Sequence, residues 1–390
     1  QLPRASQSHR EKSKIGPLNI AMTVIGTIVG AGFATGQEIA QFFVRYGKLG
    51  LLGIAVAVIL FCVVITIFLT ASRKLKGGSY AELLKRWGGP WLGGAVDIAL
   101  TLFLAGITGV MFAGAGASFQ ALGLPAFVGT ALTLAVTFIA IWFGLSGVMT
   151  VNTIVVPIML SFTMIICLLT LFSHGAVPSS VAPLAATMET VAKTDPGAAR
   201  PAGGLGFAWL WAAVIYVSYN TILSFPVLVP LGQAAKRRTL VMAGILSGCT
   251  LGLMGTAIFT AIYLSKAAML EVPLLHVAAR HGRLLQVLYG IVIWGEIMTT
   301  AVGNIFGVAQ RFEADFKVPY RLAAGIAMTI SLLISRFGFA ALVGNLYPFF
   351  GWAGVVLALI VIIRAAYLRI FTKGRLRSRK RSIIRAIRCP

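Results

Sequence analysis

The stretch Ile20–Phe43, IAMTVIGTIVGAGFATGQEIAQFF, decides the fold of this chain. It lies in a long hydrophobic segment that predicts a membrane helix, yet it contains four glycines and the polar residues Gln37, Glu38 and Gln41. Glycine weakens a helix by about 1 kcal/mol relative to alanine. A charge at the bilayer centre costs roughly 2.5–3.5 kcal/mol on insertion scales. A membrane helix that is both loosened and polar favours a cavity or a transport pathway.

The glycines of this stretch also have a second explanation. Gly26 and Gly30 stand four residues apart, as do the next two glycines, and this spacing lets two membrane helices pack closely. The glycines alone leave packing and a binding site open, whereas Glu38 directly after them favours a site. A phosphate-binding loop is excluded because the glycine spacing is wrong and no strand precedes it.

The composition of the chain is that of an integral membrane protein. Of the 390 residues, 58% are hydrophobic and 11% are charged, and the mean hydropathy is +0.92. Soluble domains have about 25% charged residues, so we expect an all-α polytopic membrane protein. Residues 98–188 contain no Asp, Glu, Lys or Arg, and this run must fold back on itself because one span needs about 20 residues. The four cysteines have neither disulfide-framework nor metal-site spacing.

Ten segments are apolar enough to be drawn as membrane spans, and a long connection rich in Ala, Pro, Ser and Gly follows the fifth. This arrangement predicts two five-helix halves of opposite orientation. The first span of each half carries the polar and helix-breaking residues, which points to a transporter's binding site. The expected spans are 15–44, 49–72, 91–119, 126–143, 148–172, 206–231, 239–264, 284–310, 322–335 and 339–363. The expected parts are a tail (1–14), a first repeat (15–173), an extracytoplasmic linker (174–205), a second repeat (206–365) and a basic tail (366–390).

The basic residues fix the expected orientation. If both termini are cytoplasmic, 25 of the 33 Lys and Arg residues lie inside, as the positive-inside rule requires of a protein in the cell membrane. Ten of them follow Ile363, and we expect this tail to contact anionic lipid. The net charge of +23 therefore reflects topology, and no nucleic-acid partner is expected.

The eighth expected span carries a polar face. Glu296, Thr299, Thr300 and Asn304 recur at helical spacing and so share one side. Such a stripe faces the bundle interior or water. Hydrogen bonding between helices is one explanation, worth roughly 0.6 kcal/mol a pair. A paired hydroxyl one turn after a carboxylate also suits a hard cation, which takes several oxygen ligands.

A catalytic alternative rests on residues 144–147, GLSG, which have the GxSG form of rhomboid-type intramembrane serine proteases. That chemistry needs a histidine base within hydrogen-bond reach of the serine. None of the four histidines lies within an expected span, and a tight turn explains the motif equally well. We therefore expect no enzyme activity.

The segment GTIVGAGFATGQEIAQFF and the YGKLGLLG that follows it resemble the YkvI-type membrane proteins, a group related to the amino acid–polyamine–organocation transporters. The resemblance extends over residues 15–365 and includes YVSYN at 216–220 and EIMTTAVGNIFG at 296–307. It implies a LeuT-like fold, with two inverted five-helix repeats and with spans one and six unwound at the bilayer midplane.

The same resemblance implies a sodium site. Its ligands would be the backbone carbonyls of Gly26 and Val29, the hydroxyls of Thr299 and Thr300, and the carbonyl of Glu296. Some proton-coupled relatives place a lysine of the fifth helix in that space, and the fifth span here has none. The implied solute site comprises Gly30, Ala31 and Gly32 of span one with Tyr216, Ser218, Tyr219 and Asn220 of span six.

We therefore expect a secondary transporter of a small organic solute, such as an amino acid or a related compound, coupled to Na⁺ or H⁺ and without a cofactor. Glu38 and Glu296 depart from a sodium–amino acid site, and they indicate either proton coupling or a cationic solute. The alternative is a transporter-like sensor that binds a solute without net flux. The protease is the remote alternative.

Overall fold

The computed structural model describes residues 16–73, 80–143, 146–173 and 207–356, and every regular element in these ranges is a helix. Both tails and the linker 174–205 lie outside the described residues. In the first half the helices are α2 (Pro17–Ile28), α3 (Ala31–Ala34), α4 (Gln37–Phe42), the 3₁₀ turn η1 (Val44–Tyr46), α5 (Lys48–Ser72), α6 (Tyr80–Ala121), α7 (Ala126–Phe143) and α8 (Ser146–Phe172).

The second half contains one long helix after another, with a short helix in the connection that follows α11. Its elements are α10 (Ala208–Ala234), α11 (Arg237–Leu264), α12 (Pro273–Ala279), α13 (Arg283–Phe316), α14 (Tyr320–Ser335) and a final helix, Phe339–Val356. Helices thus lie at the positions of the expected spans. The main difference in bounds is α6, which begins at Tyr80 and so starts 11 residues before its expected span at 91.

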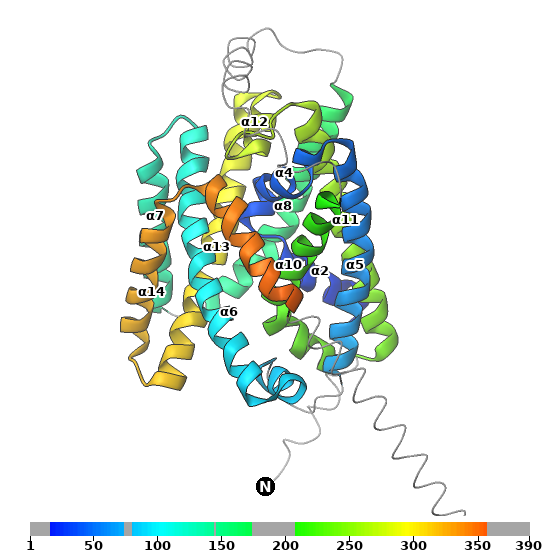
Figure 1. Ribbon diagram of the computed structural model, residues 1–390. Helices are drawn as coiled ribbons and strands as arrows, with labels where there is room; N and C mark the ends of the chain where they lie inside the picture. Colours follow the sequence, from blue (N-terminus) through cyan, green and yellow to red (C-terminus); the bar gives the residue numbers. More distant parts are fainter. Residues whose placement is uncertain (1–15, 74–79, 144–145, 174–206, 357–390) are drawn as a thin grey trace, which may run out of the picture.

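The helices form two groups, which Figure 1 shows side by side. In one group α5 packs against α10 and α11, and α2 packs against the same two helices. In the other, α6 packs against α7, α13 and α14. Helix α8 contacts both α13 and α11 and so joins the groups. Span one lies at this junction, because α2 packs in the first group while α3 packs against α13.

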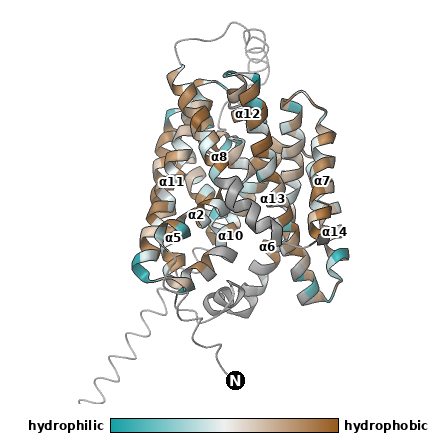
Figure 2. Ribbon diagram, turned by 180° about the vertical axis from the view of Figure 1, so that it is seen from behind, coloured by the Kyte–Doolittle hydropathy of each residue, from teal (hydrophilic) through white to brown (hydrophobic). Residues whose placement is uncertain are grey.

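The outer surface of the bundle suits lipid. Hydrophobic residues dominate the long helices, and hydrophilic ones gather towards their ends (Figure 2). Ile59 of α5, Leu102 of α6 and Leu253 of α11 are each more than 55% exposed. Among the described residues, five helices are long and apolar enough to cross a membrane. Large apolar side chains on the outside are stable only where the solvent is apolar too.

Helices α5 and α11 approach closely because small residues line their contact. A Cβ at Gly248 of α11 would lie 2.7 Å from the backbone nitrogen of Cys62 on α5, so only glycine fits there. Gly244 and Gly252 face α5 in the same way. Without a hydrophobic effect to drive them together in lipid, membrane helices depend on such close packing.

Span six is a continuous helix, whereas the resemblance implied that it is unwound. The resemblance implied an unwound segment around Tyr216–Asn220, but α10 is one continuous helix over Ala208–Ala234. Its polar side chains bond within the helix: Asn220 Nδ2 donates to the Tyr216 carbonyl (3.0 Å), and Thr221 Oγ1 donates to the Val217 carbonyl (2.7 Å). Both bonds run to the carbonyl four residues earlier, the pattern that such side chains make inside an intact helix.

Candidate functional site

Span one is interrupted at the level of its glycines. Helix α2 ends at Ile28, and Val29 and Gly30 are extended, with ψ of 103° and −169°. Helix α3 then has only four residues, and Gly36 follows in the left-handed region with φ of 80°. Each break leaves backbone donors and acceptors without helical partners. At membrane depth such groups are tolerated only in a protein interior or a cavity.

Two neighbouring helices satisfy the carbonyls at the second break. The Tyr289 hydroxyl of α13 donates to the Ala34 carbonyl at 2.6 Å. The Leu274 backbone N–H of α12 donates to the Thr35 carbonyl at 3.0 Å. Tyr289 is fully buried, and its hydroxyl also lies 2.9 Å from Thr163 Oγ1 of α8. Sequence reasoning missed Tyr289, and the signal that could have found it was a tyrosine inside a membrane span.

The glycines of span one have different roles. A Cβ at Gly30 would meet nothing within 4 Å, so this glycine borders open space and is not a packing notch. A Cβ at Gly32 would lie 2.7 Å from Cγ of Glu38, so the absent side chain makes room for that carboxylate. Gly36 packs against neighbouring elements, through Ile262 and Leu274. The interhelical packing explanation therefore holds for Gly36 and not for Gly30 or Gly32.

Glu38 joins span one to span six. Its side chain is 3% exposed and folds back over Gly32, and the Tyr219 hydroxyl donates to Glu38 Oε2 at 2.7 Å. Aromatic rings surround this bond: the centroid of Tyr219 lies 5.0 Å from that of Tyr347 and 5.6 Å from that of Tyr216. The carboxylate thus lies in an apolar, aromatic environment with one hydroxyl donor.

The other span-six candidates lie differently. Asn220 bonds to its own helix. Ser218 faces the final helix, where a Cβ at Gly354 would collide with its hydroxyl. Among the described residues the Ser218 hydroxyl has no hydrogen-bond partner. The structure therefore brings Gly32, Glu38 and Tyr219 together and places Ser218 and Asn220 outside that contact.

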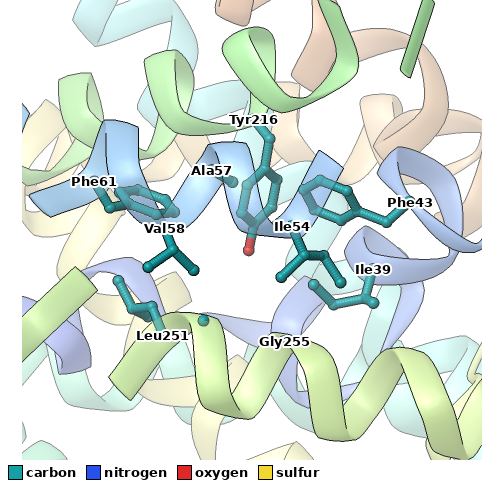
Figure 3. Close-up of a pocket in the computed structure, with 10 residues that line it drawn as sticks. Ile39, Phe43, Ile54, Ala57, Val58, Phe61, Tyr216, Leu251 and Gly255 are labelled. Atoms are coloured by element: carbon teal, nitrogen blue, oxygen red, sulfur yellow. The ribbon is translucent and has the colours of Figure 1, made fainter. Parts of the chain in front are cut away.

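A small cavity borders the same aromatic cluster. It lies between α4, α5, α10 and α11. Figure 3 shows the Tyr216 hydroxyl pointing into it, between Ile54 and Val58 of α5 and Leu251 of α11. That hydroxyl is buried and has no partner among the described residues. Tyr216 thus lines the cavity while its ring packs against that of Tyr219.

The polar face of α13 points inward, as its spacing predicts. Glu296 and Thr299 are 2% and 1% exposed, and Thr300 is half-buried. The Thr299 hydroxyl donates to the Glu296 carbonyl at 3.1 Å, and Glu296 Oε2 has no partner within the described residues. Three oxygen atoms that could bind a cation, two hydroxyls and one carbonyl, thus lie within one turn. The half-buried Gly26 and the buried Val29 lie at the end of α2.

A search of known sequences finds a protein that is similar to this chain over most of the chain's length. The chain is 29% identical over 351 residues to the uncharacterised membrane protein YkvI of Bacillus subtilis (strain 168), covering 88% of this chain and 95% of YkvI. The chain is therefore similar to YkvI over most of the length of both proteins. No family model matches the sequence of this chain.

Comparison with solved structures identifies the fold of this chain. The inward-facing conformation of Mhp1 matches with a TM-score of 0.64 at 14% identity, covering 90% of this chain and 76% of Mhp1. A Na⁺-coupled sialic acid symporter matches with a TM-score of 0.55 at 14% identity, covering 92% and 78%. The chain is therefore a multi-pass membrane protein with a LeuT-like fold, similar to the folds of Mhp1 and the sialic acid symporter. Of the GLSG motif at 144–147, Ser146 begins α8, whereas Gly144 and Leu145 lie outside the described residues.

Proposed function

We propose that the chain is a secondary active transporter of a small organic solute, an amino acid or a related compound, that works by alternating access. The observation that carries this proposal is the interruption of span one beside the buried Glu38–Tyr219 bond. An interrupted membrane helix with a polar contact at its break is the usual form of a transporter's binding site. The Na⁺-coupled sialic acid symporter with the same fold supports this reading.

The proposed architecture has ten spans in two inverted repeats, 15–173 and 206–365, with both termini in the cytoplasm. Span one is the discontinuous helix of the first repeat. In the second repeat α10 is continuous, so we propose that any interruption there arises only in another state of the transport cycle. The basic C-terminal tail contacts the anionic lipid of the inner leaflet.

The proposed solute site lies where α2 ends and α3 begins. The Val29 N–H and the Gly30 carbonyl are bonded within span one, which leaves the Gly30 N–H for a polar solute, and the open space beside Gly30 gives the solute room. Ala31 and Gly32 continue this wall. Tyr219 and Glu38 close one side of it. Tyr216, Ser218 and Asn220 of α10 are the remaining proposed solute contacts. They would reach the solute in another state of the transport cycle, because here the Tyr216 hydroxyl points into the separate cavity and Ser218 faces the final helix.

The proposed coupling site lies between the end of α2 and the polar face of α13. Its ligands are the carbonyls of Gly26 and Val29, the hydroxyls of Thr299 and Thr300, and the carbonyl of Glu296. Such an all-oxygen set suits a hard cation, and we propose Na⁺. The buried carboxyls of Glu38 and Glu296 offer H⁺ as the alternative coupling ion.

Uptake into proteoliposomes tests the proposal. Purified protein is reconstituted, and accumulation of a mixture of radiolabelled amino acids is measured under an inward Na⁺ gradient and, separately, under a pH gradient. We expect accumulation above the external concentration under one of the two gradients, abolished by a matching ionophore. Binding of a labelled amino acid to the detergent-purified protein without accumulation under either gradient would contradict transport and favour the solute sensor.

A further inference from the structure

We propose that Tyr289 is a positioning residue that couples the ion site on α13 to the solute site on span one, because it holds α3 against α13. This inference rests on the proposed function, since it concerns how the two proposed sites communicate. The atoms that carry it are the Tyr289 hydroxyl, the Ala34 carbonyl and the Thr163 hydroxyl.

Helix α3 has little structure of its own to hold it. It is one turn long, between the extended residues Val29–Gly30 and the left-handed Gly36. The carbonyl of Ala34 would bond to the N–H of Glu38 in a continuous helix, but the break at Gly36 removes that partner. The Tyr289 hydroxyl replaces it at 2.6 Å. A side chain of α13 thus fixes the position of α3.

Tyr289 itself is rigidly placed. Its ring is fully buried in the main hydrophobic core, and its hydroxyl lies 2.9 Å from Thr163 Oγ1 of α8. A tyrosine hydroxyl has one hydrogen, which it donates to Ala34, so Thr163 must be the donor in the second bond. The hydroxyl therefore joins three elements, α3, α8 and α13.

The same helix carries Tyr289 and the proposed ion ligands. Glu296 follows Tyr289 by seven residues, which places both on one face of α13, and Thr299 lies one turn further on. Helix α13 is continuous from Arg283 to Phe316, and ten residues of α-helix span about 15 Å. A shift or rotation of α13 when a cation binds must therefore move Tyr289 as well.

The other end of the link is the solute site. Ala34 lies two residues after Gly32, on whose backbone the Glu38 side chain rests. Any movement of the Ala34 carbonyl moves the whole of α3, because that helix is a single turn. The hydrogen bond from Tyr289 thus transmits a movement of α13 to Gly32, to Glu38 and to the space beside Gly30.

The test uses the full chain in proteoliposomes, with Cys62, Cys167, Cys249 and Cys389 replaced by alanine and with Gly30→Cys as a reporter. A Cβ at residue 30 meets nothing within 4 Å, so the reporter fits. The probe is an impermeant methanethiosulfonate, and its labelling rate is measured in Na⁺ and in K⁺. A second readout is the Na⁺-dependent rise in the thermal unfolding midpoint of the same proteins in detergent.

In the parent we expect Na⁺ to change the labelling rate by at least about fivefold, the lower end of typical coupling between sites. In Tyr289→Phe we expect this change to fall below about twofold while Na⁺ still raises the unfolding midpoint. A merely structural loss would reduce both readouts together. The matched control is Tyr263→Phe on α11, whose ring is 44% exposed and stacks on Phe259, and it should behave as the parent does.

An undiminished Na⁺ effect on labelling in Tyr289→Phe would overturn the inference, and so would loss of Na⁺ stabilisation in that variant. If Tyr289→Phe does not fold, Thr163→Val replaces it, because it removes the donor that orients the Tyr289 hydroxyl. We expect a reduced Na⁺ effect there, and an unchanged one would overturn the inference. If the parent itself responds to Na⁺ in neither readout, the proposed sodium coupling fails first and the inference falls with it.

Discussion

The Tyr219 hydroxyl donates a 2.7 Å hydrogen bond to the Glu38 carboxylate, and this bond joins α4 of span one to the middle of span six. Both side chains are almost fully buried, at 0% and 3% exposed. The bond therefore connects the two helices that the proposed function assigns to the solute site.

Removing this hydroxyl should destabilise the protein. Tyr219→Phe keeps the ring but leaves a buried carboxylate without its donor, which costs about 1–3 kcal/mol. The measurement is the free energy of unfolding by denaturant in detergent. Tyr263→Phe, at a half-exposed ring, should change it by less than about 0.5 kcal/mol. Equal effects of the two substitutions would show that the Glu38–Tyr219 bond contributes nothing.

Gly32→Ala should displace the Glu38 side chain, which packs directly against the backbone of Gly32. The new methyl would lie 2.7 Å from Cγ of Glu38, so the carboxylate must move. Overpacking of this kind costs about 1–3 kcal/mol. Gly30→Ala is the matched control, because its methyl would enter open space. We expect Gly30→Ala to keep the unfolding free energy within about 0.5 kcal/mol and yet to impair solute uptake, since the methyl occupies the proposed solute space. Similar unfolding free energies for both variants would contradict the geometry.

Thr299→Ala should abolish stabilisation by Na⁺. A ligand at a hundred times its dissociation constant stabilises a folded protein by about 2.7 kcal/mol, so the loss is measurable as a thermal shift in Na⁺ against K⁺. Thr329→Ala on α14 removes a similar hydroxyl, one that donates to the Gly325 carbonyl at 2.9 Å, and it should keep the Na⁺ effect. A Na⁺ shift that survives in Thr299→Ala would exclude this ion site.

The loop between α12 and α13 should respond to pH through His281, whose ring lies 2.9 Å from Thr170 Oγ1. Burial, and then the positive charge of Arg280, lower the pKa of His281 below its usual value. A lowered folded-state pKa gives stability that is complete above the unfolded pKa of about 6.5 and is lost as pH falls through the folded value. We expect the unfolding midpoint to fall more between pH 7.5 and 5.5 in the parent than in His281→Gln. Equal falls would contradict this role.

The sequence predicted the parts of this fold that depend on local patterns. Apolar runs located the helices, and the glycines before Glu38 located the break in span one. Local sequence patterns could not show that the Glu38 carboxylate packs against Gly32 or that the Tyr289 hydroxyl donates to the Ala34 carbonyl, because both contacts depend on tertiary packing. The resemblance was wrong about the unwinding of span six, because α10 is continuous over Ala208–Ala234.

The central claim is that the space beside Gly30 opens alternately to the two sides of the membrane. Labelling of Gly30→Cys by an impermeant methanethiosulfonate, in right-side-out and in inside-out vesicles, tests it most directly. We predict that replacing K⁺ by Na⁺ raises the labelling rate from one side and lowers it from the other. Rates that change in the same direction on both sides, or that do not change at all, would contradict alternating access.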